Sequence, residues 1–390
     1  DSFMNIGRRN FIKGMPALGA AGLMMTSAQR EAFARTGARS QSIINVKEFG
    51  AKGDGETHDS KAIQDALDAA GMVQGTVYFP SGKYLCHDLK VHQHTTLLAD
   101  PVWRFSPAQK GAVLVLDSDE ADCVLNITGA FGVHLHGLQI KGNPKAEKLI
   151  HGIFLNNATE FSKKEDSIVV DDCKVQHFSG HGLYLLRIWL FIVRHSHFYR
   201  NNGSGIAVVG WDGFVTDNQL SGNGQHGFGA EKGASTIMFT ANRVEWNKGY
   251  GMYINGGDAW DITGNCFDRN GGAGIYLAGM RTTAVSGNVI RRCGKDSSML
   301  GEGIDYSTQM IFDGCRGISV VCNSAAAGKD DRGKGVVTPN YGMTLANLEY
   351  CSITSNTFYK GYLKDMILDR GGHGKEFVLK NNVGSSYSGK

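Results

Sequence analysis

Three acidic residues recur near one position of a repeat and could act on a glycosidic bond. They are Asp212, Glu231 and Asp258, each about one repeat from the next. Hydrolysis of such a bond needs one carboxyl group as acid and a second as base or nucleophile, about 5 Å apart for retention and about 6.5–9.5 Å apart for inversion. If the repeats stack about 4.8 Å apart, Asp212 and Asp258 lie roughly 9–10 Å from each other with Glu231 between them. This acidic trio is our first candidate for catalysis.

A second set of residues combines basic and aromatic side chains and suits proton abstraction. The set is His226, Tyr253, Lys232, Arg187 and Arg281. Removing the proton α to a uronate carboxyl group needs a base such as Tyr, His, Lys or Arg, and a cation that stabilises the enediolate. His226 and Tyr253 could equally assist the carboxylates of the trio, so both chemistries stay open.

Flat and polar side chains around these candidates are expected to bind substrate, because sugar rings pack against aromatic surfaces. The expected substrate-binding residues are Trp211, Tyr184, Tyr276, Asn255, Lys232, Arg281, Glu302 and Asp305. Trp260 is expected to add another flat surface. The alternative is structural: aspartates in turns commonly bond to local backbone N–H groups, and outward tyrosines can simply cover a sheet.

The elements that would position these residues come from a repeat. The glycine closing a Gly-x-Gly motif recurs every 22 to 24 residues, at Gly182, Gly205, Gly227, Gly251 and Gly274. An asparagine column runs beside it, through Asn218, Asn242, Asn265, Asn288, Asn323 and Asn356. Short apolar alternations between these points indicate strands, and Gly and Asn indicate turns with positive φ. Each Asn amide can also bond to the Asn of the layers above and below.

A period near 23 residues, with about three short strands and no helical stretch, predicts an all-β parallel β-helix of about ten layers. One layer cannot bury its apolar face alone, so stacking must create the core. Laying the repeats in register gives an outward column of Tyr184, Ala207, Gly229, Tyr253, Tyr276 and Asp305. The middle residues of Gly-x-Gly form a second column of His181, Ser204, His226, Tyr250, Ala273 and Glu302. A third column holds Asp212, Ala234, Asp258 and Arg281.

The segment before the repeat carries a family resemblance. It reads INVKEFGAKGDG at 44–55, AIQ at 62–64 and GTVYFPSGKYL at 75–85. This resembles the N-terminal part of pectate-lyase-like right-handed parallel β-helix proteins, and the resemblance covers nearly all of the chain after the leader. It implies a right-handed coil and a relation to polygalacturonase-like hydrolases, polysaccharide lyases, uronan C5-epimerases and phage tailspikes.

The sequence departs from that family at two places. His58-Asp59 stands where an Asp pair is usual, and Gly180-His181-Gly182 is similar to a polygalacturonase motif whose other members are missing in order. We therefore interpret this Gly-His-Gly as part of the repeat. The resemblance is specific for the fold and leaves the reaction open.

A capping helix is expected inside the segment 43–85, ahead of regular layers at about 120–383. Ile63, Ala66, Leu67 and Ala70 form one helical stripe, and Asp59 is the expected N-cap. Such a helix would close the end of the coil, whose terminal strands otherwise expose apolar surface and unpaired backbone.

The first 34 residues resemble a twin-arginine export signal. Arg8-Arg9 precede an apolar run at 14–25 and the small-residue site Ala32-Phe33-Ala34. Asp1 to Phe3 precede Met4 and are expected to be foreign to the natural protein. An amphipathic N-terminal helix is the alternative, and the run is too short to span a bilayer. We expect a single β-helix domain over 35–390 that is periplasmic or secreted.

Composition excludes several classes of protein. A net charge of +3 without a basic, aromatic-rich run argues against a nucleic-acid partner. The histidine pairs 92/94, 134/136 and 195/197 lack a third ligand at metal-site spacing, and the cysteines match no zinc pattern, so neither a metal nor a cofactor is expected. The expected partner is a poly- or oligosaccharide, without stable membrane insertion. The resemblance allows a homo-oligomer.

These observations favour an exported carbohydrate-active enzyme that cleaves glycosidic bonds. We slightly favour a glycoside hydrolase using Asp212, Glu231 and Asp258, assisted by His226 and Tyr253. The alternative is a polysaccharide lyase or uronan C5-epimerase. A second alternative is a non-catalytic glycan-binding surface protein on the same scaffold.

Overall fold

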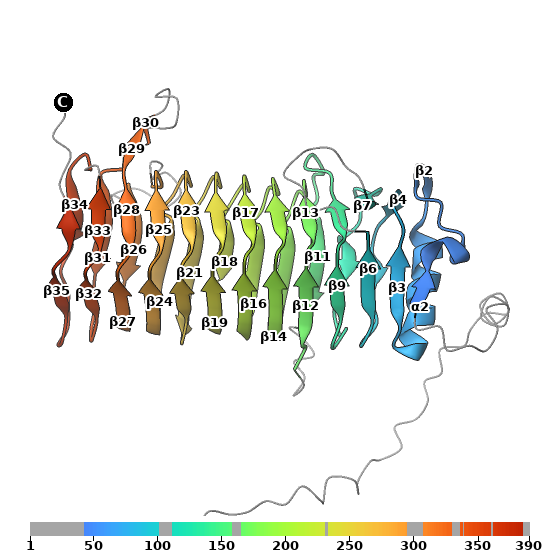
Figure 1. Ribbon diagram of the computed structural model, residues 1–390, viewed down its shortest axis with the longest axis horizontal. Coiled ribbons are helices and arrows are strands. Elements are labelled where there is room, and N and C mark those ends of the chain that lie inside the picture. The colour runs from blue at the N-terminus through green and yellow to red at the C-terminus, as the bar shows by residue number, and fades with distance from the viewer. Residues whose placement is uncertain are drawn as a thin grey trace, which may run out of the picture. The chain divides into compact units, whose positions relative to one another are not determined.

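The protein winds into a coil of stacked parallel strands (Figure 1). The computed structural model describes residues 43–100, 111–157, 165–230, 233–294, 307–329, 336–337, 339–359 and 362–384. Two large sheets, of 21 and 13 strands, contain nearly all of the described strands. Ten strands of the smaller sheet, β10 to β36, fall in the region where about ten regular layers are expected. The predicted parallel β-helix is therefore confirmed.

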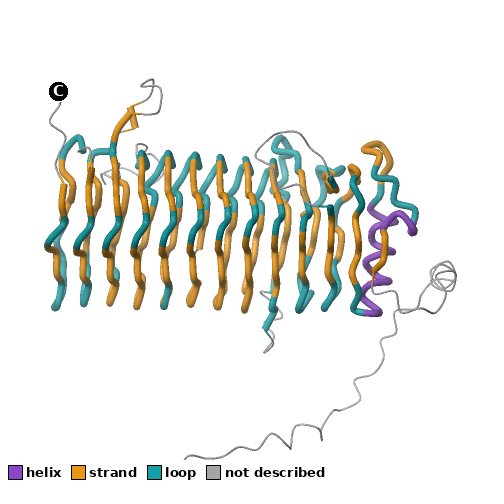
Figure 2. The backbone as a smooth tube through the Cα atoms, in the orientation of Figure 1, coloured by secondary structure: helices purple, strands orange, loops and turns teal. Residues whose placement is uncertain are grey.

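Each complete layer has three faces, which follow one another along the chain as the tube in Figure 2 shows. The first and second faces make up the 21-stranded sheet, and the third face is the 13-stranded sheet. The strands that cross both the first and second faces are β14 (Leu183–Arg194), β16 (Ile206–Thr216) and β24 (Ile275–Ser286). The other strands of the first face are β5 (Leu89–Lys90), β8 (Cys123–Asn126), β11 (His151–Asn156), β18 (Phe228–Ala230), β21 (Met252–Asp258), β26 (Thr308–Asp313), β31 (Tyr341–Ala346) and β34 (Asp365–Asp369).

The remaining strands complete the other two faces and one small hairpin. The second face holds β1 (Ile43–Asn45), β3 (Thr76–Phe79), β6 (Thr96–Ala99), β9 (His134–His136), β12 (Ile168–Asp171), β19 (Ala234–Thr240), β22 (Asp261–Thr263), β27 (Arg316–Val321), β32 (Ser352–Thr354) and β35 (Val378–Lys380). The third face holds β2 (Asp54–His58), β4 (Gly82–Cys86), β7 (Ala112–Leu116), β10 (Gln139–Lys141), β13 (Lys174–Gln176), β15 (His197–Tyr199), β17 (Gln219–Ser221), β20 (Arg243–Glu245), β23 (Cys266–Asp268), β25 (Val289–Arg291), β28 (Ser324–Ala326), β33 (Thr357–Tyr359) and β36 (Val383–Gly384). An antiparallel pair joins β29 (Gly328–Lys329) and β30 (Val336–Val337).

Alternation along each strand sends apolar side chains into one continuous core. In β14 and β16, Leu183, Leu185, Ile206 and Val208 are all buried, while the residues between them point outward. Each such burial is worth about 1.5–3 kcal/mol, so the core is built layer by layer from modest contributions. The outward positions, in contrast, are open to other uses.

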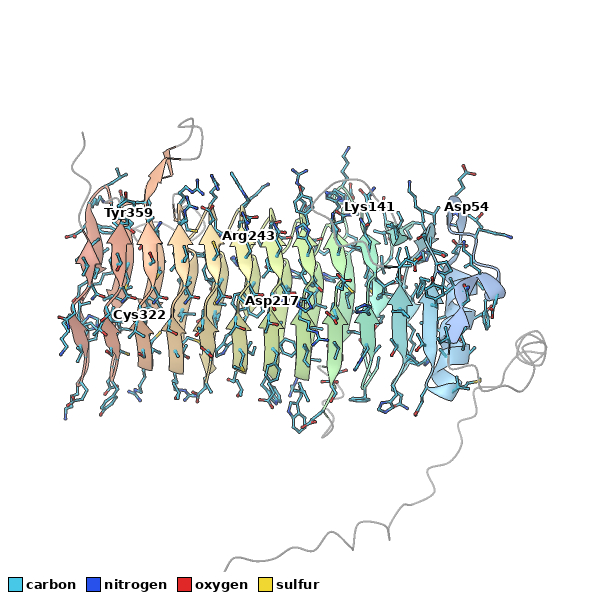
Figure 3. The ribbon with its side chains drawn as sticks, viewed as in Figure 1. Asp54, Lys141, Asp217, Arg243, Cys322 and Tyr359 are labelled. Carbon is cyan, nitrogen blue, oxygen red and sulfur yellow. The ribbon has the colours of Figure 1, made fainter. Side chains whose placement is uncertain are left out.

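The predicted asparagine column lies at the turn between the second and third faces. Each side chain in it donates to the Oδ1 of the asparagine in the next layer, for example Asn242 to Asn265 at 3.1 Å and Asn265 to Asn288 at 2.9 Å. Figure 3 labels Asp217 and Cys322, which precede two members of this ladder, Asn218 and Asn323, and lie in one row along the coil. The ladder extends beyond the predicted members to Asn382.

A second asparagine ladder, which the sequence analysis missed, lies between the third and first faces. It runs through Asn201, Asn223, Asn247 and Asn270, with side-chain bonds of 3.1, 2.9 and 2.8 Å. Asn270 then donates to Cys293 Sγ at 3.5 Å. The two ladders satisfy buried backbone groups at two corners of each layer, which is why these turns repeat so strictly.

The capping helix is confirmed as α2 (Ser60–Val73), beside a short 3₁₀ helix, η1 (Val46–Phe49). Its expected stripe of Ile63, Ala66, Leu67 and Ala70 is buried in the main core. Asp59 does occupy the N-cap position, but its carboxylate makes no capping bond. It accepts instead from the backbone N–H groups of Lys52 and Gly53, at 2.7 and 2.8 Å. Its role is to fix the Gly-rich loop against the helix.

Residues 1–42 lie outside the described part of the chain, so the export signal stays a prediction. Within the part that the structure does describe, no helix has the length and apolar character needed to cross a membrane.

Candidate active site

A pocket with an empty volume of about 470 Å³ opens on the first face, over four consecutive layers from β14 to β21. Its lining residues are His181, Tyr184, Ser204, Ala207, Val208, Val209, Gln225, His226, Gly229 and Tyr253. Two of the residues predicted to be catalytic, His226 and Tyr253, and one predicted to bind substrate, Tyr184, thus share one pocket.

Small side chains create the pocket. Tyr184, Ala207, Gly229 and Tyr253 occupy one outward column on successive layers, as the register of the repeats predicts. Three layer spacings separate the two tyrosines, or roughly 14 Å at about 4.8 Å each. Ala207 and Gly229 form the floor between them because neither has a side chain long enough to fill that space.

A histidine–tyrosine pair stands at each end of the pocket. The rings of His181 and Tyr184 lie 4.8 Å apart at one end, and those of His226 and Tyr253 stack 4.9 Å apart at the other. His181 and His226 come from the middle position of Gly-x-Gly, with Ser204 in the layer between them. The Gly-His-Gly interpreted as mere repeat therefore contributes a pocket residue, and its place in the same column as His226 was the signal for it.

Both pocket histidines are held in one neutral tautomer. The backbone N–H of Ser204 donates to His181 Nδ1 at 2.9 Å, and that of Tyr250 donates to His226 Nδ1 at 3.1 Å. Burial lowers the pKa of each imidazole to about 4, with the charge of His181 adding to the effect at His226. Because Nδ1 accepts, the proton of the neutral ring sits on Nε2. Near neutral pH each imidazole thus offers Nε2–H as a hydrogen-bond donor.

Aromatic rings continue away from the pocket on both sides. His151 stacks on His181 at 5.3 Å, and burial lowers its pKa to about 4. Tyr276 stacks on Tyr253 at 4.8 Å with an angle of 11° between the rings. The predicted neighbourhood of Tyr253 and Tyr276 is confirmed, but their ring faces cover each other.

The acidic trio is not arranged as predicted. In the register of the second face, Trp211 pairs with Ser235, Ser235 with Asp258, and Asp258 with Arg281. Asp212 is therefore one position beyond the column of Asp258, because the turn between the first and second faces differs in length from layer to layer. Glu231 lies outside the described residues.

Asp212 and Asp258 have distinct surroundings. Asp212 Oδ2 accepts the indole N–H of Trp189 at 2.8 Å. Asp258 Oδ2 lies 3.8 Å from Arg281 Nε, while its Oδ1 is buried and, among the described residues, has no hydrogen-bond partner. Neither carboxylate lines the pocket.

The other predicted substrate-binding residues lie at varied places. Trp211 is half-buried on β16 beyond the pocket, and Asn255 is exposed on β21. Trp260 is instead fully buried and packs edge-on against Phe228, so it offers no surface for a sugar. Lys232 lies outside the described residues.

Glu302 and Asp305 also lie outside the described residues, and other side chains take the positions predicted for them. Ile311 follows Tyr276 in the outward column, and the backbone N–H of Gly274 donates to Gln309 O where Glu302 was expected. The inserted turn after Arg292 is longer than the repeat suggested, and it shifts the register by six or seven residues.

No group of three or more potential metal ligands occurs in the portion of the chain covered by the structure.

Similar proteins carry the coil in several enzyme classes. Alginate lyase 7 from Azotobacter vinelandii is 30% identical over 195 residues, which is 47% of this chain and 23% of that protein. Mannuronan C5-epimerase AlgE2 from the same organism is 24% identical over 233 residues, which is 55% of this chain. The chain matches only 23% of the length of each of these two relatives.

Solved structures show the same architecture. The A-module of mannuronan C-5 epimerase AlgE4 from Azotobacter vinelandii superposes with a TM-score of 0.60 at 17% identity, covering 88% of this chain and 98% of that one. A GH87 α-1,3-glucanase from Streptomyces thermodiastaticus gives 0.60 at 18% identity, covering 88% of this chain and 70% of that one. The model of the right handed beta helix region matches residues 123–290 and 232–386. The chain therefore belongs to the right-handed β-helix family.

Proposed function

We propose that this protein acts on an acidic polysaccharide by removing the proton α to a uronate carboxyl group, at the pocket between His181/Tyr184 and His226/Tyr253. The observation that carries the proposal is the lining itself. Two neutral imidazoles and two phenols converge there, and the described lining has no carboxylate. Similarity to proteins named mannuronan C5-epimerase and alginate lyase supports the same chemistry.

In this proposal the pocket residues divide the work of proton transfer. The Nε2–H groups of His181 and His226 donate to the substrate carboxylate and stabilise the enediolate that forms when the α proton leaves. Tyr253 takes that proton, and Tyr184, at the other end of the pocket, faces the opposite side of the sugar. Return of a proton to that side inverts the carbon, as an epimerase does. Breaking the bond to the β oxygen instead gives the unsaturated sugar made by a lyase.

The size of the gap supports a sugar ring between the two pairs. His181 and His226 are two layers apart, about 10 Å at the usual strand spacing. Van der Waals contacts of about 3.5–4.0 Å on each side leave room for one ring between them. Arg187 is exposed on β14, three residues beyond Tyr184, and supplies a positive charge at the rim.

The decisive experiment replaces Tyr253 by Phe, which removes the hydroxyl and keeps the stacked ring. We expect Tyr253→Phe to lower the rate on alginate or polygalacturonate by about 10²–10⁴-fold, the usual contribution of a general acid or base. Product is followed by the absorbance of unsaturated uronate, and exchange of the α proton with deuterated water by NMR. Tyr276→Phe is the matched control, because Tyr276 stacks next in line but does not line the pocket.

Three outcomes would contradict the proposal. Wild-type rates in Tyr253→Phe would remove Tyr253 from the reaction. Reducing ends without unsaturated product or deuterium exchange would indicate a hydrolase. Retention on a glycan gel without any product would indicate a binding protein.

Hydrolysis is the second candidate, and one observation favours it. The buried Oδ1 of Asp258 has no hydrogen-bond partner in the described residues, an arrangement that is costly unless the group is used. If Asp258 is a catalytic carboxylate, Asp258→Asn abolishes the release of reducing ends from neutral glucans. If proton abstraction at the pocket is the function, Asp258→Asn changes the rate on polyuronate only a few-fold.

Export by the twin-arginine route belongs to the same proposal, since an extracellular polysaccharide lies outside the cytoplasm. Replacing Arg8 and Arg9 by Lys in the full chain should retain the protein in the cytoplasm, as cell fractionation would show. Unchanged export of this variant would contradict the route.

A further inference from the structure

Two tryptophans lie on consecutive layers next to the pocket. Trp189 of β14 pairs in register with Trp211 of β16, and both are half-buried. Each has a core-facing neighbour in its strand, Ile188 and Gly213 respectively, so both indoles sit on the outward side of the coil. This pair of residues is called the tryptophan platform below.

Two aspartates fix the orientation of Trp189. Its indole N–H donates to Asp212 Oδ2 at 2.8 Å, and its backbone N–H donates to Asp166 Oδ2 at 2.7 Å. Asp166 is buried and is itself held by Asn157 Nδ2 at 2.8 Å. Asp212 adopts a left-handed backbone conformation, φ 58°, which is uncommon outside Gly and Asn. The polar edge of the indole is thus tied down, and what the ring can present to a ligand is its flat face.

The platform is continuous with the pocket along one strand. Ala207, Val208 and Val209 of β16 line the pocket, and Trp211 follows two residues later. From Ala207 to Trp211 the strand covers about 13 Å at roughly 3.3 Å per residue. That is the reach of a short oligosaccharide rather than of a single ring.

The rings along the coil axis are less suited to hold a sugar chain. Tyr253 and Tyr276 stack with their planes 11° apart, and His226 stacks on Tyr253 at the same angle. Their faces are therefore covered by one another. In the described part of the chain, no aromatic ring stacks on Trp189.

We propose that the tryptophan platform is a distal sugar-binding subsite, and that the polysaccharide crosses the coil along β14 and β16 rather than along its axis. This rests on the proposed function, since the pocket holds the reacting sugar. Indole faces offer large, rigid contact area to the apolar side of a sugar ring at low entropic cost. Asp212 is then a positioning residue that holds Trp189, not a catalytic acid.

The first test removes the indole. Trp189→Ala should raise the KM for alginate or polygalacturonate about 5- to 10-fold, the range expected for one lost aromatic contact, with kcat changed less than twofold. Disaccharides and trisaccharides, which end before the platform, should show the wild-type KM. Trp246→Ala is the matched control, because Trp246 is 54% exposed and follows β20 on the third face. Equal effects of Trp189→Ala and Trp246→Ala would overturn the proposal.

The second test separates positioning from catalysis at Asp212. Asp212→Asn retains a side-chain oxygen that can accept the indole N–H, so it should behave like the wild type. Asp212→Leu cannot accept, and it should reproduce the raised KM of Trp189→Ala. Loss of kcat in Asp212→Asn would overturn the positioning role and favour hydrolysis.

A binding measurement distinguishes failure of this inference from failure of the proposed function. Wild type, Trp189→Ala and Trp246→Ala are run on gels containing alginate, polygalacturonate or neutral glucan. Retardation of wild type and Trp246→Ala but not Trp189→Ala on any of the gels supports the platform, and if only neutral glucan retards, the uronate reaction fails while the platform stands. Equal mobility of the three proteins on every gel overturns the platform.

Discussion

The turn between the second and third faces and the pocket region of the first face repeat with the same period, yet they use their repeated positions differently. At the turn, the same side chain recurs at Asn218, Asn242, Asn265, Asn288, Asn323, Asn356 and Asn382. At the middle of Gly-x-Gly, the side chains are His181, Ser204, His226, Tyr250 and Ala273. One region is uniform, and the other changes at every layer.

The difference follows from what each position faces. An asparagine in the ladder bonds to its equivalents in the layers on either side, so a different side chain in one layer leaves groups unpaired in two others. A residue at the middle of Gly-x-Gly faces outward, and its neighbours constrain only its backbone. Uniform positions in this coil thus serve the fold, and variable positions are available for recognition and chemistry.

The largest effect should come from breaking the uniform region. Asn265→Ala removes two acceptor bonds to Asn242 and two donor bonds, to Phe239 O and Asn288 Oδ1. Because these groups are buried, we expect the free energy of unfolding to fall by about 3–5 kcal/mol. Urea denaturation measures it. Asn255→Ala, an exposed asparagine on the first face, is the control and should change stability little. Equal losses in the two variants would contradict the assignment of the ladder to stability.

A pair of glycines sharpens the comparison within one strand region. A Cβ at Gly227 would lie 2.4 Å from Val244 Cγ1 and 2.7 Å from Gly251 O, whereas a Cβ at Gly229 would meet Ser204 Oγ only at 3.4 Å. We expect Gly227→Ala to destabilise by about 1–3 kcal/mol through overpacking. Gly229→Ala should stay within about 0.5 kcal/mol of wild type. It should nevertheless weaken substrate binding, because the methyl group narrows the pocket floor; thermal melts and KM values test both statements.

The smallest effect concerns pH and the pocket histidines. The pKa of His226 is about 4 in the folded protein and about 6.5 in an unfolded chain. Below pH 6.5 the unfolded state therefore binds a proton that the folded state refuses, and stability falls as the pH drops toward 4. His226 should cost about 1 kcal/mol between pH 7 and 5.5.

Removing that titration gives the measurement. Urea midpoints of His226→Gln at pH 7 and 5.5 should differ less than those of the wild type. His134→Gln, on the exposed side of the second face, is the control and should retain the wild-type difference. A wild-type pH dependence in His226→Gln would mean that other groups account for it.

Most of the fold could be predicted from the sequence because it is local and repeated. The Gly-x-Gly spacing, the asparagine column and the helical stripe at Ile63 and Leu67 each report a requirement that recurs or that lies within one element. The column of Tyr184, Ala207, Gly229, Tyr253 and Tyr276 was correct for the same reason.

The predictions failed where the repeat changes length. The turn between the first and second faces gains or loses residues from layer to layer, which separates Asp212 from the column of Asp258. The insertion after Arg292 replaces the expected Asp305 by Ile311 next to Tyr276. Trp260 was expected at the surface and lies in the core, since nothing in its local sequence distinguishes an inward from an outward indole at a turn.

The sequence by itself determined that this chain is a capped stack of parallel layers, since the spacing of glycine, asparagine and alternating apolar residues has no other stable arrangement. Only the tertiary structure decided which outward side chains share a pocket. Small residues at Ala207 and Gly229 open a space whose walls, His181 and Tyr253, are 72 residues apart in the chain. A hollow arises from what neighbouring layers leave unfilled, and that depends on the exact register of every layer between its walls.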